Sequence, residues 1–174
     1  NLSFLIYGLG LTGKSVVNFF VKNNVRNFKV WDDHNKDLYK NKRTSNLVKS
    51  LHTVDYIILS PGVSFMKSKN KNNLIKFQKK IITDLDLFFL VKKFSKSIVV
   101  TGTNGKSTTV QLLSDILNLS KKDARAVGNI GRSILNEKKI SKNTIFVVET
   151  SSYQIEYSKI FKPNLALLLN ISPD

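Results

Sequence analysis

The chain has 174 residues, with 28 Lys and Arg against 12 Asp and Glu, a formal net charge of +16, and no cysteine. This length suits one domain or two small ones, and the lack of cysteine excludes a disulfide scaffold, a thiolate zinc site and a cysteine nucleophile. The apolar runs are far shorter than the ~18 residues of a membrane span, and no basic leader opens the chain, so we expect a cytoplasmic protein without membrane contact.

The positive charge is carried by 24 Lys and only 4 Arg, which are spread along the chain. Proteins that read nucleic acids usually depend on the planar fork of arginine for phosphates and base edges. We therefore interpret the charge as a basic surface suited to acidic ligands in general, and we expect no nucleic-acid partner.

Short apolar runs alternate with helical patterns, which predicts βα units and mainly parallel sheets. In the first half we predict strands over 3–7, 28–31, 56–59 and 80–83, and helices over 13–23, 72–79 and 84–93. Residues 35–50 are polar and weakly patterned, and no element is predicted there. A polar stretch at 92–96 indicates a boundary between a first domain, 1–93, and a second domain, 94–174.

The second half begins the same pattern again, with a strand over 97–101, a glycine loop and a helix. Four apolar residues of that helix stand at helical spacing, which is typical of core: Val110, Leu113, Ile116 and Leu117. Further strands are predicted over 124–127, 145–149 and 165–170. Because the chain stops after a strand that looks buried, we expect an incomplete domain whose open sheet edge favours aggregation or low stability.

The first glycine loop, G-L-G-L-T-G-K-S at 8–15, satisfies both the dinucleotide fingerprint G-x-G-x-x-G and the strict phosphate-loop string. Its place between a strand and a helix favours close approach of a diphosphate to the helix N-terminus. Asp32 and Asp33 end the next strand about 20 residues later, where an acidic side chain can accept a ribose hydroxyl. We therefore predict a diphosphate-bearing nucleotide at this loop, with its sugar or base at Asp32.

The second glycine loop, T-G-T-N-G-K-S-T at 101–108, fails the strict string because Val100 stands where the first glycine belongs. It is nevertheless the better phosphate cradle, since its backbone N–H groups can wrap a β-phosphate and Lys106 can reach the β and γ oxygens. Ser107 can ligate magnesium, and Glu149, at the end of a later strand, is the natural second ligand. We therefore predict the ATP site at the second loop.

These motifs, in this order and spacing, resemble the Mur ligases of peptidoglycan synthesis. The matching stretches run through nearly the whole chain: G-L-G-L-T-G-K-S at 8–15, S-P-G-V at 60–63, T-G-T-N-G-K-S-T at 101–108, G-N-I-G at 128–131, E-T-S-S-Y-Q-I-E at 149–156 and L-N-I-S-P-D at 169–174. The ATP loop is shared across the family, whereas the stretch at 149–156, together with the first loop, is similar to the branch that adds D-glutamate.

The resemblance implies an α/β protein with a Rossmann-like, UDP-binding first domain and an incomplete P-loop-type ATP-binding central domain. A third domain, absent here, would bind D-glutamate. The implied activity is ATP-dependent addition of D-glutamate to UDP-N-acetylmuramoyl-L-alanine through an acyl phosphate, with Mg²⁺ as a further cofactor and a monomer as the complete enzyme. Since the family motif continues with His after Asp174, we expect a fragment that does not turn over by itself.

Carried over to this sequence, the resemblance assigns two sets of residues. The ATP-binding set is Gly102, Thr103, Asn104, Gly105, Lys106, Ser107 and Thr108, with Lys106 and Glu149 catalytic and Ser107 and Glu149 holding the metal. The UDP-substrate set is Leu9, Thr12, Asp32, Gly62, Asn129 and Ser151, and Ser152 and Gln154 would line the substrate channel. The alternative is a nucleotide-binding module without catalysis, for a dinucleotide or a UDP-sugar, which leaves Lys106 and Glu149 unexplained.

Overall fold

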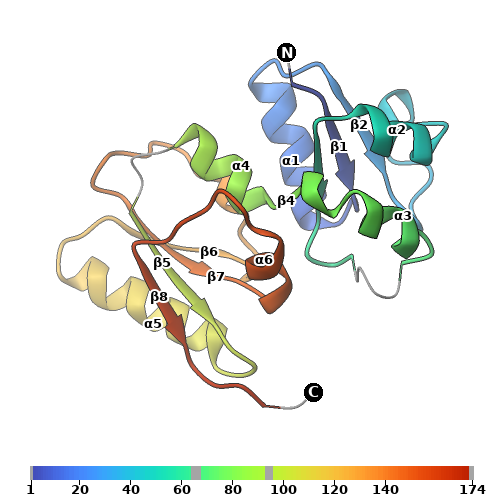
Figure 1. Ribbon diagram of the computed structural model, residues 1–174. Coiled ribbons are helices and arrows are strands. Elements are labelled where there is room, and N and C mark those ends of the chain that lie inside the picture. Colours follow the sequence, from blue (N-terminus) through green and yellow to red (C-terminus); the bar gives the residue numbers. More distant parts are fainter. Residues whose placement is uncertain (1, 64–67, 93–95, 173–174) are drawn as a thin grey trace. The chain divides into compact units, whose positions relative to one another are not determined.

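The computed structural model describes residues 2–63, 68–92 and 96–172 (Figure 1). The chain divides into two compact units, Asn1–Asp84 and Leu85–Asp174, and each unit has its own parallel sheet. The division falls at the start of helix α4 (Asp84–Val91), earlier than the boundary at 93/94 that the sequence pattern favours. The polar stretch that suggested the later boundary includes residues 93–95, which lie outside the described residues.

Helix α4 belongs with the second unit because its buried side chains contact that unit. The ring of Phe88 packs edge to face on Phe146, with centroids 5.1 Å apart. The Asp86 carboxylate is fully buried and accepts the backbone N–H groups of Ile160 and Phe161, each at 2.8 Å. The division between the units therefore follows the burial of helix α4.

The first unit is a four-stranded parallel sheet in the order β2-β1-β3-β4. Its strands are β1 (Phe4–Tyr7), β2 (Phe28–Trp31), β3 (Tyr56–Leu59) and β4 (Ile81–Ile82), its helices are α1 (Leu11–Lys22), α2 (Leu47–Thr53) and α3 (Lys71–Lys76), and its short 3-10 turns are η1 (Lys40–Lys42) and η2 (Gln78–Lys80). All four residues of β1 are buried, as in a parallel strand covered on both faces. The register places Tyr7 beside Trp31 and Leu59, so β1, β2 and β3 end at one edge.

The predicted strands and helices of the first unit are confirmed in kind, β2 and β3 with their predicted bounds and the others with shifted ends, whereas α2 and the turn η1 were not predicted. The buried face of α2 is short, with Leu47 and Leu51 pointing into the core. Asn46 caps it by accepting the backbone N–H of Lys49 at 2.9 Å. A helix of seven residues spans about two turns, too few for a clear period in the sequence.

The second unit is a four-stranded parallel sheet in the order β6-β7-β5-β8. After α4 its elements are β5 (Lys96–Thr101), α5 (Lys106–Leu119), β6 (Ala124–Gly128), the 3-10 turn η3 (Ile134–Asn136), β7 (Ile145–Glu149), α6 (Ser152–Tyr157) and β8 (Leu165–Leu168). Val100 of β5 lies between Glu149 of β7 and Leu167 of β8. The carboxyl end of β7 therefore lies beside the strand that leads into the second glycine loop.

Helix α5 covers one face of this sheet (Figure 1) and provides part of its core. Val110 is fully buried against Val100 and Val147, and Leu113 and Leu117 pack against the same cluster, which confirms three of the four core residues predicted for this helix. Ile116 is 49% exposed, so its prediction as core is wrong. The apolar face of α5 is narrower than the sequence pattern suggests, because Ile116 lies beyond the stripe that faces the sheet.

Strand β8 also differs from expectation, because it looks buried in the sequence and all four of its residues are exposed. Leu165 and Leu168 are 63% and 62% exposed. Among the described strands, β8 pairs with β5 alone and forms an edge of the sheet. An apolar run identifies a strand that can be buried, but its burial depends on what covers it.

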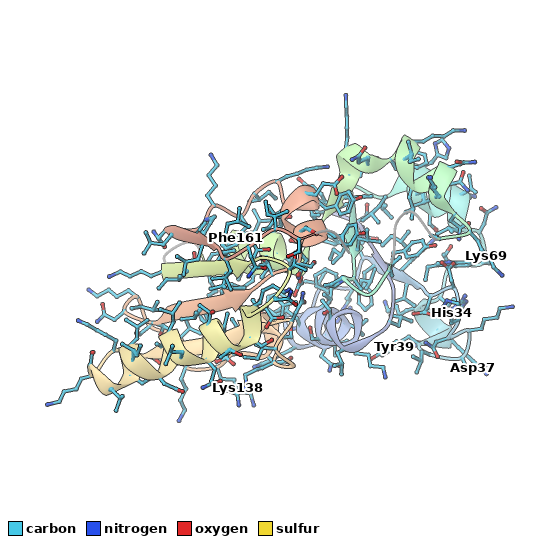
Figure 2. All side chains as sticks on the ribbon, turned by 90° about the horizontal axis from the view of Figure 1, so that it is seen from below. His34, Asp37, Tyr39, Lys69, Lys138 and Phe161 are labelled. Carbon is cyan, nitrogen blue, oxygen red and sulfur yellow. The ribbon has the colours of Figure 1, made fainter. Side chains whose placement is uncertain are left out.

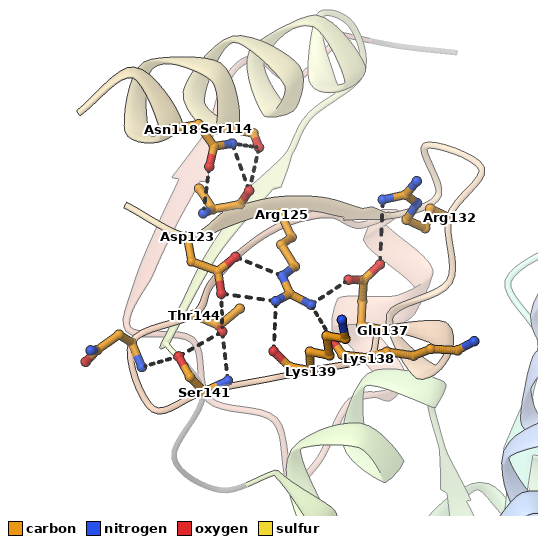
Figure 3. A network of polar contacts seen from close by, with 12 residues as sticks. Ser114, Asn118, Asp123, Arg125, Arg132, Glu137, Lys138, Lys139, Ser141 and Thr144 are labelled. Carbon is orange, nitrogen blue, oxygen red and sulfur yellow. Dashed lines mark hydrogen bonds and ion pairs between the residues drawn. The ribbon is translucent and has the colours of Figure 1, made fainter. Parts of the chain in front are cut away.

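The connection from β6 to β7 is held by Arg125 at the start of β6 (Figure 3). Its guanidinium donates to the carboxylates of Asp123 and Glu137, at 3.0 and 3.1 Å, and to the carbonyls of Lys138 and Lys139. The Asp123 carboxylate also accepts the Thr144 hydroxyl at 2.6 Å, just before β7 begins. The half-buried guanidinium of Arg125 thus fixes the return of this connection to the sheet.

The surface carries lysine side chains on both units. Lys69 in the first unit and Lys138 in the second are exposed (Figure 2). Within the described residues, no helix combines the length and the apolar character that crossing a lipid bilayer requires.

Candidate functional site

The loop between β5 and α5 concentrates anion-binding groups at the end of the second sheet. Gly105 has φ of 81°, a left-handed conformation that glycine adopts without strain, and α5 begins at the next residue. The free backbone N–H groups of a helix N-terminus attract anions. The Lys106 ammonium donates to the carbonyls of Gly102 and Thr103, at 2.6 and 2.7 Å. Cationic and backbone donors therefore lie together in the predicted ATP loop.

The predicted metal ligands, Ser107 and Glu149, are in direct contact. The Ser107 hydroxyl donates to Glu149 Oε2 at 2.6 Å, and Glu149 is only 6% exposed. Both are hard oxygen donors, which magnesium prefers, and magnesium in nucleotide sites usually has one or two protein ligands beside phosphates and water. The residues present therefore fit Mg²⁺ bound together with a nucleotide.

The G-N-I-G loop after β6 lies against the backbone of Glu149. The N–H of Asn129 donates to the Glu149 carbonyl at 3.2 Å, and the Asn129 side chain is exposed. Gly128 has φ of 102°, and a Cβ there would lie 2.2 Å from the same carbonyl oxygen. Glycine is therefore required at this position, and it brings Asn129 beside the acidic residue of the site.

Ser151 and Gln154 form a capping box at the start of α6. The Ser151 hydroxyl accepts the Gln154 N–H at 3.3 Å, and the Ser151 N–H donates to Gln154 Oε1 at 3.1 Å. This reciprocal pairing satisfies two donors that the helix itself leaves free. Gln154 is 3% exposed, whereas Ser152 is exposed. The spacing of Ser151 and Gln154 is therefore explained by helix capping, and of the predicted channel residues only Ser152 presents an exposed side chain.

The first glycine loop is shaped by close packing at two of its three glycines. Gly8 has φ of 92°, and a Cβ at Gly13 would lie 1.9 Å from the Gly8 carbonyl oxygen. A Cβ at Gly10, in contrast, would meet nothing within 4 Å, which leaves this position accessible to a ligand. Lys14 is exposed, and the buried Ser15 hydroxyl donates to the Thr12 carbonyl at 2.9 Å. Ser15, the serine of the strict phosphate-loop string, therefore bonds to its own helix and is not directed toward a metal site.

Asp32, predicted to hold a ribose, is 7% exposed and holds the backbone around it. Its carboxylate accepts the N–H groups of Leu9 at 2.6 Å, His34 at 2.9 Å and Asn35 at 2.8 Å. Burial opposes ionisation, but the N–H groups of Asn35, Leu9 and His34 together outweigh it, so the pKa of Asp32 lies below its ordinary value. Asp32 therefore ties the first glycine loop to the turn after β2, a role that the sequence pattern did not indicate.

Asp33, predicted beside Asp32, lies at the same sheet edge in a polar cluster whose other members the sequence did not indicate. The Asp33 carboxylate accepts the Tyr7 hydroxyl at 2.8 Å, Trp31 Nε1 at 2.9 Å and Asn70 Nδ2 at 3.0 Å. Burial raises the pKa of the Tyr7 phenol, hydrogen bonds with Ser68 and Asn70 oppose the rise, and Asp33 adds to it. The available signal was the pair of aromatic residues with polar tips, Tyr7 and Trp31, at the ends of adjacent strands.

The predicted residues thus fall into two groups. Leu9, Thr12, Asp32 and Gly62 lie in the first unit, where Gly62 is exposed and Thr12 is half-buried. Asn129, Ser151 and the whole ATP-binding set lie in the second unit, around the carboxyl ends of β5, β6 and β7.

The two parallel sheets, their glycine loops and the Ser107–Glu149 contact define an α/β protein of the phosphate-loop class. Comparison with known families is consistent with this. The model described as "Mur ligase middle domain" matches residues 100–174, and the model described as "Mur ligase MurD-like, N-terminal domain" matches residues 3–82. The chain belongs to the Mur ligase family.

Two similar proteins support the same assignment. The UDP-N-acetylmuramoylalanine–D-glutamate ligase of Rickettsia prowazekii is 41% identical over 97% of this chain, and that of Wolbachia pipientis wMel is 33% identical over 100%. The chain spans 38% and 35% of the lengths of these two relatives. A solved structure, UDP-N-acetylmuramate:L-alanyl-gamma-D-glutamyl-meso-diaminopimelate ligase from Neisseria meningitides, shares the fold with a TM-score of 0.52 at 16% identity, over 100% of this chain and 62% of its own.

Proposed function

We propose that this chain provides the UDP-substrate-binding and ATP-binding domains of a cytoplasmic ligase of peptidoglycan synthesis. That ligase adds D-glutamate to UDP-N-acetylmuramoyl-L-alanine at the expense of ATP. The main observation in support of ATP binding is the contact of the Ser107 hydroxyl with the Glu149 carboxylate at 2.6 Å, directly beside Lys106 at the start of α5. The substrates follow from the names of the relatives that match nearly all of this chain.

The chemistry explains why such a site needs cationic groups. A carboxylate is a poor electrophile, so one of its oxygens first attacks the γ-phosphorus of ATP and ADP leaves. The amine of D-glutamate then attacks the acyl carbon, loses a proton, and phosphate departs. Lys106 would neutralise charge on the phosphate oxygens, and Ser107 and Glu149 would hold magnesium. Bound magnesium would supply further stabilisation of the negative charge that gathers on the transferred phosphoryl group.

The first unit would bind the UDP part through Leu9, Thr12, Asp32 and Gly62. The open space at Gly10 and Gly62 supports this assignment, because no described side chain or backbone would meet a Cβ at either position. Asp32 would act mainly by holding the Leu9 N–H and the turn after β2 in place. In the second unit, Asn129 and Ser151 would contact the muramoyl-peptide end, with Asn129 the residue whose exposed side chain is adjacent to the Glu149 backbone.

The proposal is tested by two lysine variants of the 174-residue chain, titrated calorimetrically with MgATP. Lys106→Ala removes a charged donor from the second loop, and we expect binding to weaken about 10- to 100-fold, as for hydrogen bonds to charged groups. Lys14→Ala is the matched control, since Lys14 occupies the same place in the first loop and is exposed. MgATP affinity lost in Lys14→Ala and kept in Lys106→Ala would overturn the assignment of the ATP site.

A second titration tests the substrate. We expect UDP-N-acetylmuramoyl-L-alanine to bind the native chain and the Lys106→Ala variant equally, because its UDP part occupies the first unit. Preference for NADH over the UDP-linked substrate would instead favour a dinucleotide-binding module.

A further inference from the structure

Asn170, two residues after β8, is hydrogen-bonded to both backbone groups of Asn104 in the ATP loop. The N–H of Asn104 donates to Asn170 Oδ1 at 2.9 Å, and Asn170 Nδ2 donates to the Asn104 carbonyl at 3.1 Å. This is the pairing that one amide makes with another, so a single side chain fixes the orientation of two successive peptide groups.

The backbone around Asn170 extends the same attachment. Its carbonyl accepts the N–H of Thr103 at 3.1 Å, and the N–H of Ser172 donates to the Thr103 hydroxyl at 3.0 Å. A Cβ at Gly102 would lie 3.1 Å from the Asn170 carbonyl oxygen, so the loop and the segment after β8 are closely packed. The loop is therefore held from outside by a segment that follows it by more than sixty residues.

These contacts change which groups of the loop are free for phosphate. The sequence pattern assigned the loop's N–H groups to a β-phosphate as a set, but those of Thr103 and Asn104 donate to Asn170. Phosphate binding then depends on the remaining N–H groups of the loop, those of Gly102 and of the residues from Gly105 onward, and on Lys106. The Lys106 ammonium donates to the carbonyls of Gly102 and Thr103. These carbonyls belong to the same peptide groups as the N–H groups that Asn170 accepts, so Asn170 also helps to position the lysine.

We propose that Asn170 is a positioning residue for phosphate binding, which sets the shape of the ATP loop before the nucleotide arrives. This inference rests on the proposed ATP site. The Asn170 amide acts through Asn104 and Thr103 and makes no contact with phosphate. Preorganisation of this kind raises affinity because less conformational freedom is lost when the ligand binds.

The size of the effect follows from the exposure of the contacts. Both side-chain hydrogen bonds to Asn104 are at the protein surface, where such bonds are at the weak end of their range. We therefore expect loss of both bonds in Asn170→Ala to weaken MgATP binding about fivefold. Inorganic tripolyphosphate with magnesium should lose affinity by the same factor, because the geometry that is lost belongs to the phosphate loop.

Asn164→Ala is the control, because the Asn164 side chain also accepts a backbone N–H, at the opposite end of β8. Asn164 Oδ1 accepts the N–H of Ser97 at 2.8 Å, and the Asn164 N–H donates to the Ser97 carbonyl at 3.1 Å. Asn164→Ala removes one side-chain hydrogen bond and Asn170→Ala removes two, so we expect both variants to melt at a lower temperature than the native chain, with the larger change in Asn170→Ala. Only the Asn170 variant is expected to change affinity for MgATP and tripolyphosphate.

The experiment is a calorimetric titration of the native 174-residue chain, Asn170→Ala, Asn170→Gln and Asn164→Ala, well below their melting temperatures. Asn170→Gln keeps an amide but displaces it by one methylene, so we expect it to bind as weakly as the alanine variant. We also expect faster hydrogen exchange of the Asn104 backbone amide in Asn170→Ala and Asn170→Gln, which would report directly that the loop has lost its attachment.

The outcomes separate the two proposals. If the native chain binds neither MgATP nor tripolyphosphate, the proposed ATP site fails. If it binds both and the Asn170 variants bind equally well, the ATP site stands and the positioning role of Asn170 is wrong. Equal weakening in Asn164→Ala would also overturn that role, since it would show a general loss of stability.

Discussion

At the scale of single residues, both glycine loops are held in place by polar side chains that bind backbone groups. Asp32 holds the first glycine loop, and Asn170 holds the second. Both are polar residues just after strands, a position that usually suggests ligand contact. Their partners in the glycine loops, Leu9 and Asn104, lie more than twenty residues away in the sequence, so this role becomes visible only in the folded chain.

Asp32 makes a prediction at this scale. In Asp32→Asn, one acceptor oxygen becomes a donor that faces backbone N–H groups, so we expect the first unit to lose about 1–3 kcal/mol at pH 7. Because the pKa of Asp32 is lowered in the folded state, its stabilisation is present above the unfolded pKa near 3.8 and is lost as the pH falls through the folded value. The difference between native and variant chains should therefore shrink below about pH 4.

Urea unfolding at pH 7 and pH 3, followed by the fluorescence of Trp31, measures this difference. Trp31 is the single tryptophan and lies in the first unit, so its signal reports that unit. Asp37→Asn is the control, since the Asp37 side chain is 89% exposed and should leave stability unchanged at both pH values. An unchanged midpoint in Asp32→Asn would contradict the structural role of Asp32.

At the scale of elements, the β6–β7 connection illustrates how one side chain can replace regular structure. Apart from the turn η3, the stretch from Asn129 to Thr144 has no helix or strand, and Arg125 holds its last part through carbonyls and carboxylates (Figure 3). The same connection begins with Gly128 and Asn129 against Glu149. Its attachment therefore helps to keep the candidate site in shape.

Arg125→Ala tests this attachment. The Arg125 side chain is 19% exposed and that of Glu137 is 8% exposed, so the variant leaves a buried carboxylate without its closest cation. We expect a loss of about 2–3 kcal/mol of unfolding free energy, measured by scanning calorimetry.

Arg132→Ala serves as the control for the same carboxylate. Arg132 is 70% exposed and lies 3.9 Å from Glu137, and exposed pairs of this kind contribute little. We expect its effect to stay below about 0.5 kcal/mol. Similar losses in both arginine variants would show that the fork of Arg125 is not what holds the connection.

At the scale of the whole molecule, the two sheets differ in how well they are covered. β1 is buried along its length, whereas β8 forms an edge and exposes Leu165, Leu167 and Leu168. Exposed apolar edge strands are templates for pairing with other chains. The isolated 174-residue chain should therefore associate through β8.

Leu165→Lys and Leu168→Lys, combined in one chain, test this expectation. Charge on an edge strand opposes pairing between chains, so we expect less association in static light scattering and an unchanged melting temperature. Leu119→Lys is the control, because Leu119 is 84% exposed at the end of α5, away from any strand edge. Equal improvement by Leu119→Lys would indicate an effect of net charge alone.

Much of the fold could be predicted because its signals are local. Strands β2 and β3 were predicted with their observed bounds, and the two glycine loops with their following helices were found from motif and spacing. The choice of the second loop over the strict string also rested on local chemistry, and the contact of Ser107 with Glu149 supports it. Helix α2 was missed because it is too short to show a period.

The sequence by itself determined the order of the elements, the two glycine loops and the residues able to carry phosphate chemistry, since these depend on neighbours along the chain. Tertiary structure decided which polar groups bind backbone, as at Asp32 and Asn170, and which apolar groups stay exposed, as at Ile116 and β8. The reason is physical: a hydrogen bond or a buried surface requires a second partner, and the packing of distant segments determines where that partner lies.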